Sequence, residues 1–173
     1  DVRCLFPLAS GVYGADDYSN YVVDFEPTNR YAASLRSSHV NKIYYDPTVR
    51  YQPWSNADGS LMNNADPTCA PHNPLNTAAG CRNLTVNNTQ TARWLKSDGT
   101  RSSSQSKTFY PAVYFNYVSG SINDASSYTE IEIISSTASY VGGPNRSDCT
   151  AAPNCTYNEE IQNFANWYTY YRS

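Results

Sequence analysis

The sequence predicts an α+β fold: an antiparallel β-rich domain with a short early helix, a long C-terminal helix and loops clipped by disulfides. Three observations favour this class. Sixteen tyrosines against one methionine, with only 16% charged residues, are typical of a secreted, β-rich and loop-rich surface protein. The stretches 108–118 and 128–135 have the composition of strands. The stretch 157–173 repeats aromatic and apolar residues with the period of a helix.

The length of 173 residues predicts a single domain over 1–173 that can bury its own core. The chain opens on Asp1 and shows no signal peptide, so we expect a mature or excised piece of a longer protein. A net charge of −3 without clustered Lys and Arg argues against a nucleic-acid partner. No apolar run reaches the ~18–20 residues of a membrane span, so we expect no span.

The first half of the chain contains few regular elements. A strand is predicted at 21–25, and a short helix at 29–39, where Asn29 can cap the first turn. Prolines interrupt 44–54, so this stretch is expected to be extended. The stretch 55–90 is rich in Pro, Asn and Asp-Gly turns, which predicts a long loop region tied down by a disulfide.

The second half contains the predicted strands. A strand at 91–96 and a turn at 97–100 begin a hairpin or meander. A polar, Ser-rich loop is expected at 101–107, before the strand at 108–118.

The strand at 128–135 alternates between charged and apolar side chains. This pattern predicts that Glu130 and Glu132 face solvent. The residues predicted to face inward are Thr129, Ile131 and Ile133.

The C-terminal helix has the clearest local signals. Thr156 and Glu159 form a capping box at its start. One face is expected to bury Tyr157, Ile161, Phe164, Tyr168 and Tyr171. The chain stops in mid-pattern after Arg172, without the Gly or Pro that commonly follows a helix, so we expect a boundary through or just after the helix.

Five cysteines occur, at Cys4, Cys69, Cys81, Cys149 and Cys155. Two local disulfides are predicted, Cys69–Cys81 and Cys149–Cys155. Each would close a short loop and stabilise the fold by ~2–3 kcal/mol in the loop-entropy model. Disulfides in turn indicate an exported protein.

The alternative use of a cysteine is metal ligation, since Cys69 and His72 have C-x-x-H spacing. A second ligand pair that would complete four ligands is missing from the sequence. Cys4 is left over, either as a free thiol or as the partner of a cysteine upstream.

No pattern of residues indicates catalysis, so we expect a protein that is not an enzyme and has no cofactor or metal in this segment. His39 and His72 are the only histidines, and the G-x-S-x-G elbow of serine hydrolases is absent. Glu159 and Glu160 are adjacent and thus poorly placed to flank one bond. They are better explained as first-turn acids that the helix dipole favours.

Four aromatic residues form the candidate ligand contact: Tyr44, Tyr45, Tyr51 and Trp54. Tyr and Trp are favoured at contact surfaces because they bury area at a low entropy cost. These four could form an aromatic surface for a sugar or a protein. The alternative is that these aromatics, which flank prolines, pack within the fold and do not bind a ligand.

Two aromatic-rich segments form recognisable motifs. The first runs from Asn41 to Pro47, NKIYYDP, and continues to Tyr51–Trp54. The second runs from Ile161 to Arg172, IQNFANWYTYYR. They resemble, in the same order, the N-x-x-Y-Y-N-P…Y-x-P and Q-N-F-A-N-W-Y-S-Y-Y-R-T-R segments of the PilY/PilC family of type IV pilus tip-associated proteins.

The resemblance implies an exported protein at the pilus tip, the cell surface or the outer membrane. Such proteins act in adhesion to host cells or abiotic surfaces, in pilus assembly with minor pilins, and in twitching motility. They combine a von Willebrand A-like region with a β-propeller that binds calcium. This chain carries neither the D-x-S-x-S strand of the first nor the propeller, so calcium is expected only in parts of the family that are absent here.

The chain resembles an insertion within the von Willebrand A-like region, with the 157–173 helix shared with the parent domain. In that arrangement Trp167 or Tyr170 would be substantially exposed, or covered by a crystal or dimer contact, because the parent domain that should cover them is absent. The alternative from a different class is a free-standing, secreted, glycan-binding β domain.

Overall fold

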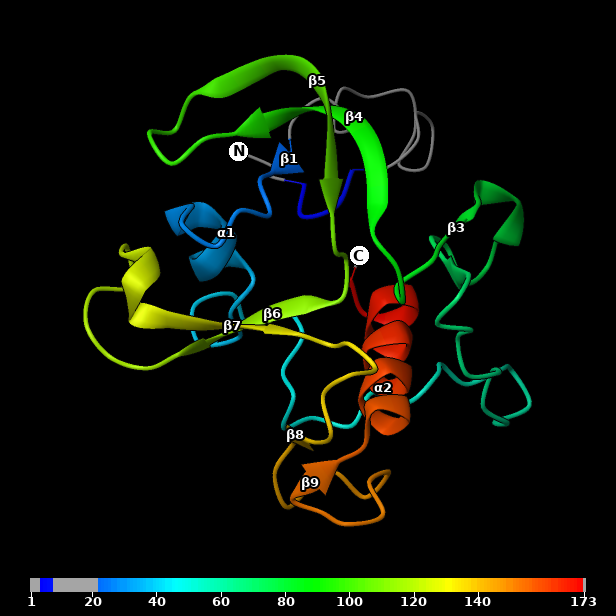
Figure 1. Ribbon diagram of the computed structural model, residues 1–173. Coiled ribbons are helices and arrows are strands. Elements are labelled where there is room, and N and C mark those ends of the chain that lie inside the picture. The colour runs from blue at the N-terminus through cyan, green and yellow to red at the C-terminus, as the bar shows by residue number, and fades with distance from the viewer. Residues whose placement is uncertain (1–3, 8–21, 173) are drawn as a thin grey trace. The chain divides into compact units, whose positions relative to one another are not determined.

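The computed structural model describes residues 4–7 and 22–172 (Figure 1). Its fold class is α+β, as predicted, with small and mostly antiparallel sheets, a short early helix and a long C-terminal helix. The chain divides into two compact units. Unit 1 consists of Asp1–Tyr44 and Val86–Glu132, and unit 2 consists of Tyr45–Thr85 and Ile133–Ser173.

Unit 1 contains a sheet with the order β1-β4-β5. Strand β1 (Val22–Val23) pairs in parallel with β4 (Asn88–Leu95), which pairs antiparallel with β5 (Arg101–Phe109). The predicted polar loop at 101–107 is therefore wrong. The hydrogen bonds to β4 hold this strand, while most of its side chains are exposed on both faces, so no apolar alternation marks it in the sequence.

The predicted strand at 108–118 is divided between two strands, because residues 110–112, which include Pro111, leave strand geometry. After the break, β6 (Val113–Tyr117) pairs antiparallel with β7 (Tyr128–Glu132), which follows the 3₁₀ turn η3 (Ala125–Ser127). Thr129 is exposed, which contradicts the predicted inward position.

Helix α1 (Arg30–Leu35) begins where predicted, because the Oδ1 atom of Asn29 accepts hydrogen bonds from two first-turn amides. It ends earlier than the predicted 29–39, since Arg36 leaves helical geometry. The buried Arg36 guanidinium instead donates to three backbone carbonyls, those of Leu5, Val23 and Asp24. The core of this unit contains Val23, Ala32 and Leu95.

Unit 2 is organised around helix α2 (Tyr157–Tyr170). The predicted capping box is present: the Thr156 side chain accepts from the Glu159 amide, and the Glu159 side chain accepts from the Thr156 amide. The predicted loop at 55–90 contains three short elements: β2 (Ala70–Pro71), η2 (Thr77–Ala79) and β3 (Cys81–Arg82). A further ladder joins β8 (Tyr140–Val141) to β9 (Asn154–Cys155).

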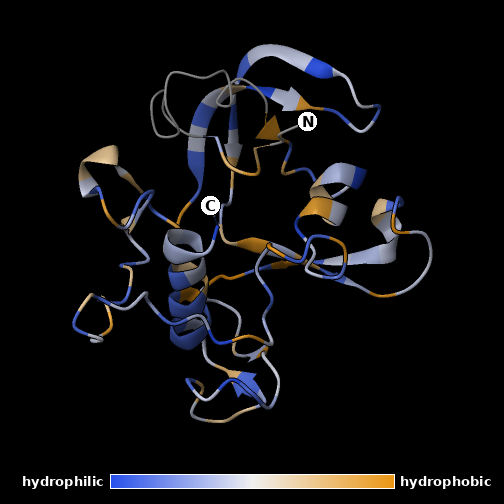
Figure 2. Cartoon of the chain, turned by 180° about the vertical axis from the view of Figure 1, so that it is seen from behind, coloured by the Kyte–Doolittle hydropathy of each residue, from blue (hydrophilic) through white to orange (hydrophobic). Residues whose placement is uncertain are grey.

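Helix α2 is buried around nearly its whole circumference. Figure 2 colours it mostly as hydrophilic, yet its buried residues run from Glu160 to Tyr170 with Gln162 as the exception. A helix of this composition can be buried only if its polar side chains find partners. The amide side chains of α2 therefore determine what packs on it.

The expected exposure of Trp167 or Tyr170 is wrong, since the two side chains are 1% and 6% exposed. The Trp167 ring packs against Tyr45 and Phe164, with centroids 6.0 and 5.1 Å away. By contrast Tyr171, which was assigned to the buried face, is 41% exposed. The burial of Trp167 depends on a segment far away in the sequence, which the helical period alone does not indicate.

The two disulfides are those predicted, Cys69–Cys81 and Cys149–Cys155. They are compatible with an extracellular protein. The fifth cysteine, Cys4, takes part in neither bridge, and its carbonyl accepts a hydrogen bond from the Val23 amide. Within residues 4–7 and 22–172, none of the helices has the length and apolar character needed to cross a membrane.

Candidate functional site

A polar pocket lies beside α2 in unit 2. Its volume of about 380 Å³ falls within the range of small-molecule sites. The walls come from the segments 50–53 and 61–64, from Asp148, and from the α2 residues Gln162, Asn163 and Asn166. These segments are far apart in the sequence, so the pocket exists only in the folded unit.

Two asparagines of α2 hold the pocket walls in place. The Asn163 side chain accepts from the Tyr51 amide at 2.7 Å and donates to the Val49 carbonyl at 2.8 Å. The Asn166 side chain accepts from the Ala65 amide at 2.9 Å and donates to the Tyr51 carbonyl at 3.0 Å. Asn166 Nδ2 also donates to the Asn64 side chain at 3.0 Å. These bonds anchor both loop segments to α2.

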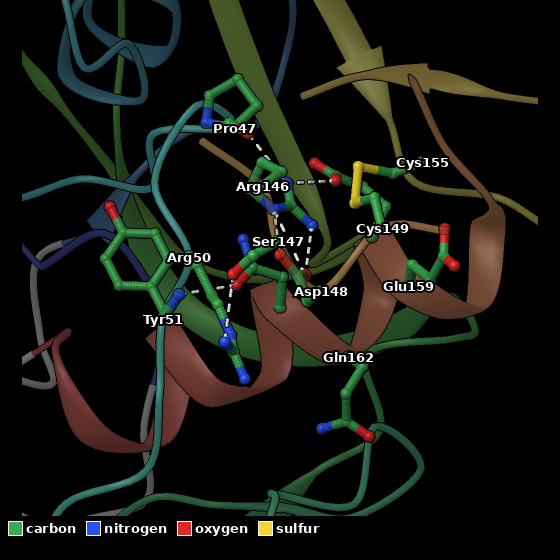
Figure 3. A network of polar contacts seen from close by, with 12 residues as sticks. Pro47, Arg50, Tyr51, Arg146, Ser147, Asp148, Cys149, Cys155, Glu159 and Gln162 are labelled. Atoms are coloured by element: carbon green, nitrogen blue, oxygen red, sulfur yellow. Dashed lines mark hydrogen bonds and ion pairs between the residues drawn. A yellow bond between two sulfur atoms is a disulfide. The ribbon is translucent and has the colours of Figure 1, made fainter. Parts of the chain in front are cut away.

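One end of the pocket rests on a buried charge network around Arg146 (Figure 3). Its guanidinium donates to Glu160 Oε2 at 2.7 Å and to the Pro47 carbonyl at 2.8 Å. It also bonds to both carboxylate oxygens of Asp148 at 2.9 Å. The Tyr45 hydroxyl donates to Glu160 Oε1 at 2.6 Å. Asp148 is thereby fixed where its carboxylate lines the pocket.

Burial sets the direction of the pKa shifts in this network. Desolvation raises the pKa of Glu160, and the hydrogen bonds from Arg146 and Tyr45 oppose that shift. Desolvation also raises the pKa of Tyr45 well above its ordinary value, so its hydroxyl keeps its proton and donates. Sequence reasoning missed this network, since Glu160 was explained by the helix dipole alone.

The side chains of Arg50 and Asn63 are exposed and line the pocket. Arg50 donates from Nη1 to Ser147 Oγ at 3.1 Å, beside Asp148 (Figure 3). Neither side chain is part of the buried network. Both can therefore turn towards a bound molecule without a change in the fold.

The four predicted contact residues do not form one aromatic surface. Tyr44 and Tyr45 are 0% exposed, and the Tyr44 hydroxyl donates to the Val113 carbonyl within unit 1. Tyr51 is half-buried and lines the pocket. Trp54 is 38% exposed and packs against Tyr170, which matches the packing alternative in part.

The polar wall residues were not predicted from the sequence. A signal was present, because Gln162, Asn163 and Asn166 lie within one turn of α2 and share a side of the helix. Amides at such positions on a buried helix need partners. Which segments supply the partners is decided by tertiary structure alone.

The alternative of metal ligation by Cys69 and His72 does not match the structure. The Cys69 sulfur is bonded to Cys81, and His72 Nδ1 lies 2.9 Å from the Tyr168 hydroxyl. Arg82 Nε donates to the same hydroxyl at 3.1 Å, which leaves the hydroxyl proton for Nδ1. Burial, with Arg82 and Arg172 nearby, lowers the pKa of His72 to about 4. Among the residues that the structure describes, no cluster of three or more His, Cys, Asp or Glu is placed to hold a metal.

A second pocket lies in unit 1, with a volume of about 560 Å³. Its charged lining consists of Asp24, Glu26, Lys107, Glu130 and Glu132. Lys107 Nζ already bonds to Asp24 at 2.6 Å and to Glu26 at 3.1 Å. The Lys107 side chain thus already pairs with two of the acidic groups in this pocket. The pocket beside α2 is therefore the better candidate site.

Comparison with known proteins finds no matching family model, no similar curated protein and no similar solved structure.

Proposed function

We propose that this chain is a non-enzymatic part of a type IV pilus tip-associated protein. It acts at the cell surface, pilus tip or outer membrane, in adhesion, pilus assembly and twitching motility. Its partners are the minor pilins of the pilus tip and a receptor on a host cell or an abiotic surface. The segment needs no cofactor of its own, and calcium binds in other parts of the parent protein.

One observation carries the proposal: the two segments on which the family resemblance depends pack against each other. Asn163 and Asn166, in the C-terminal segment, bond to the backbone of Tyr51, in the first segment. Tyr45 and Trp167, one from each segment, have ring centroids 6.0 Å apart. If the two motifs were alike to the family in composition alone, they would have no reason to pack together. Their packing supports the interpretation that they belong to one structural unit of the kind that the family contains.

The insertion within a von Willebrand A-like region remains part of the proposal in modified form. The burial of Trp167 counts against a C-terminal helix that lacks its natural cover. The insertion would therefore keep most of α2 in its own core, and the parent domain would contact the exposed Tyr171 and the residues after it.

Deletion of the gene in the bacterium that encodes the chain tests the proposal. We expect fewer surface pili by electron microscopy, smaller twitching zones and weaker adherence, all restored by the intact gene. A deletion strain with normal piliation, twitching and adherence would overturn it.

The pocket favours a second candidate, a free-standing, secreted, glycan-binding domain. That protein would bind carbohydrate, while its deletion would leave piliation and twitching unchanged. The same strains therefore separate the two candidates.

A further inference from the structure

We propose that the pocket beside α2 binds a saccharide through the hydroxyl groups of the sugar. The proposal rests on the proposed adhesive function, to which it adds a ligand class and a binding site. The chemistry and the stability of the pocket walls carry the inference.

The pocket is formed before any ligand arrives. The backbone of its two loop walls is bonded to Asn163 and Asn166, two buried side chains of a rigid helix. The end beside Asp148 is held by the buried Arg146. A preformed polar site saves the ordering entropy that a flexible loop would lose on binding.

The charge in the pocket is balanced. Among the described residues that line it, Arg50 and Asp148 carry charge, and their charges are opposite. The two buried groups behind them, Arg146 and Glu160, also pair with each other. With no net charge the site does not attract a phosphate or a polyanion, and an uncharged polar ligand is favoured.

The lining offers both hydrogen-bond donors and acceptors. Arg50 donates, Asp148 accepts, and the amide side chains of Gln52 and Asn63 do both. Within Asp148, Oδ1 accepts one hydrogen bond from Arg146 and Oδ2 accepts two, so Oδ1 retains capacity for a ligand hydroxyl. Sugar hydroxyls also donate and accept, which matches this set.

The pocket also has apolar surfaces for the ring of a sugar. Tyr51 is half-buried in the wall, next to Pro53, and Leu61 lies on the other loop. Such surfaces can cover the C–H faces of a sugar ring while its hydroxyls reach the polar groups. The volume of about 380 Å³ suits a small ligand, so we expect recognition of a terminal sugar or a short oligosaccharide.

An array of immobilised mono- and oligosaccharides, probed with the full chain, is the first test. The strongest ligand is then titrated by isothermal calorimetry against Arg50→Ala and Asn63→Ala. Both side chains are exposed, so these variants should keep the melting temperature of the parent. We expect each to weaken binding about tenfold or more, because a hydrogen bond to a ligand is lost.

Matched controls make the same changes outside the pocket. Arg93→Ala and Asn158→Ala remove exposed side chains on β4 and α2 and should leave affinity unchanged. The proposal is overturned if no saccharide binds, or if both pocket variants bind as well as the controls. It is also overturned if a saccharide binds and only Trp54→Ala abolishes binding, which would place the site on the exposed tryptophan.

The outcome is separable from that of the proposed function. Suppose that deletion of the gene impairs adherence while the strain carrying Arg50→Ala and Asn63→Ala adheres normally. The adhesive function is then supported, and the proposal of a saccharide pocket is overturned. If the isolated chain binds sugar while the deletion strain is normal in piliation and adherence, the saccharide pocket is supported and the proposed pilus function is overturned.

Discussion

Arg146 Nη1 donates a 2.7 Å hydrogen bond to Glu160 Oε2, and both side chains are 0% exposed. The pair joins a loop next to the Cys149–Cys155 disulfide to the first turn of α2. A buried ion pair adds little stability compared with an apolar replacement, but removal of one partner leaves a buried charge uncompensated.

Arg146→Ala should therefore lower the free energy of unfolding by about 3–5 kcal/mol in urea denaturation. Arg50→Ala is the matched control, because the same change at an exposed side chain should cost about 0.5 kcal/mol or less. Equal effects of the two substitutions would mean that the buried pair does not hold unit 2 together.

Tyr45→Phe removes only the hydroxyl that donates to Glu160 and accepts from Asn163 Nδ2 at 3.1 Å. Because a buried carboxylate loses a partner, we expect a cost of about 1.5–3 kcal/mol. Tyr171→Phe removes a hydroxyl that bonds to the Gln52 carbonyl at the surface and should cost much less. Thermal unfolding of both variants gives the comparison, and a Tyr45→Phe protein as stable as the parent would contradict it.

His72 predicts a loss of stability in acid. Its pKa in the folded chain is about 4, below the ordinary value of 6.5, because of burial and then of Arg82 and Arg172. Between these values the unfolded chain takes up a proton that the folded chain does not, so stability falls as pH drops from about 6.5 to 4. The full effect is at most about 3 kcal/mol.

The measurement is urea denaturation of the parent and of His72→Gln at several pH values from 7.5 to 4.5. Both chains share all other titrating groups, so the difference in their pH dependence isolates His72. We expect the parent to lose more stability than the variant over this range. If the unfolding free energies of the two chains change equally with pH, the pKa of His72 is not lowered by folding.

Phe164→Ala and Trp167→Ala should both be strongly destabilising, by about 3–5 kcal/mol each. Their side chains are 0% and 1% exposed, with ring centroids 5.1 Å apart. Periodicity alone would have predicted a small cost at Trp167. If chemical denaturation shows that Trp167→Ala lowers the free energy of unfolding by less than about 1 kcal/mol, the side of α2 that carries Trp167 would again be expected to contact a parent domain.

Local signals in the sequence predict the local features of this fold. Thr156 and Glu159 lie three residues apart, and Asn29 directly precedes its helix, so each cap can be inferred from neighbouring residues. The two disulfides join cysteines 12 and 6 residues apart, which is close enough for the pairing to follow from spacing.

Features that depend on distant residues were missed for a physical reason. The strand β5 lacks an apolar face, so only its pairing with β4 defines it. Tyr45 has an aromatic side chain suited to a surface contact, yet it is buried by residues more than 100 positions away. The pocket combines four separate parts of the chain, and no local pattern marks Arg50 and Asp148 as neighbours.

The most direct test of the account is immunogold labelling of intact cells of the source organism with antibodies against this chain. The account predicts gold particles at pilus tips and on the outer surface, and their absence from a strain in which the gene is deleted. Labelling that requires permeabilised cells, with none on the pili or the outer surface of intact cells, would contradict it.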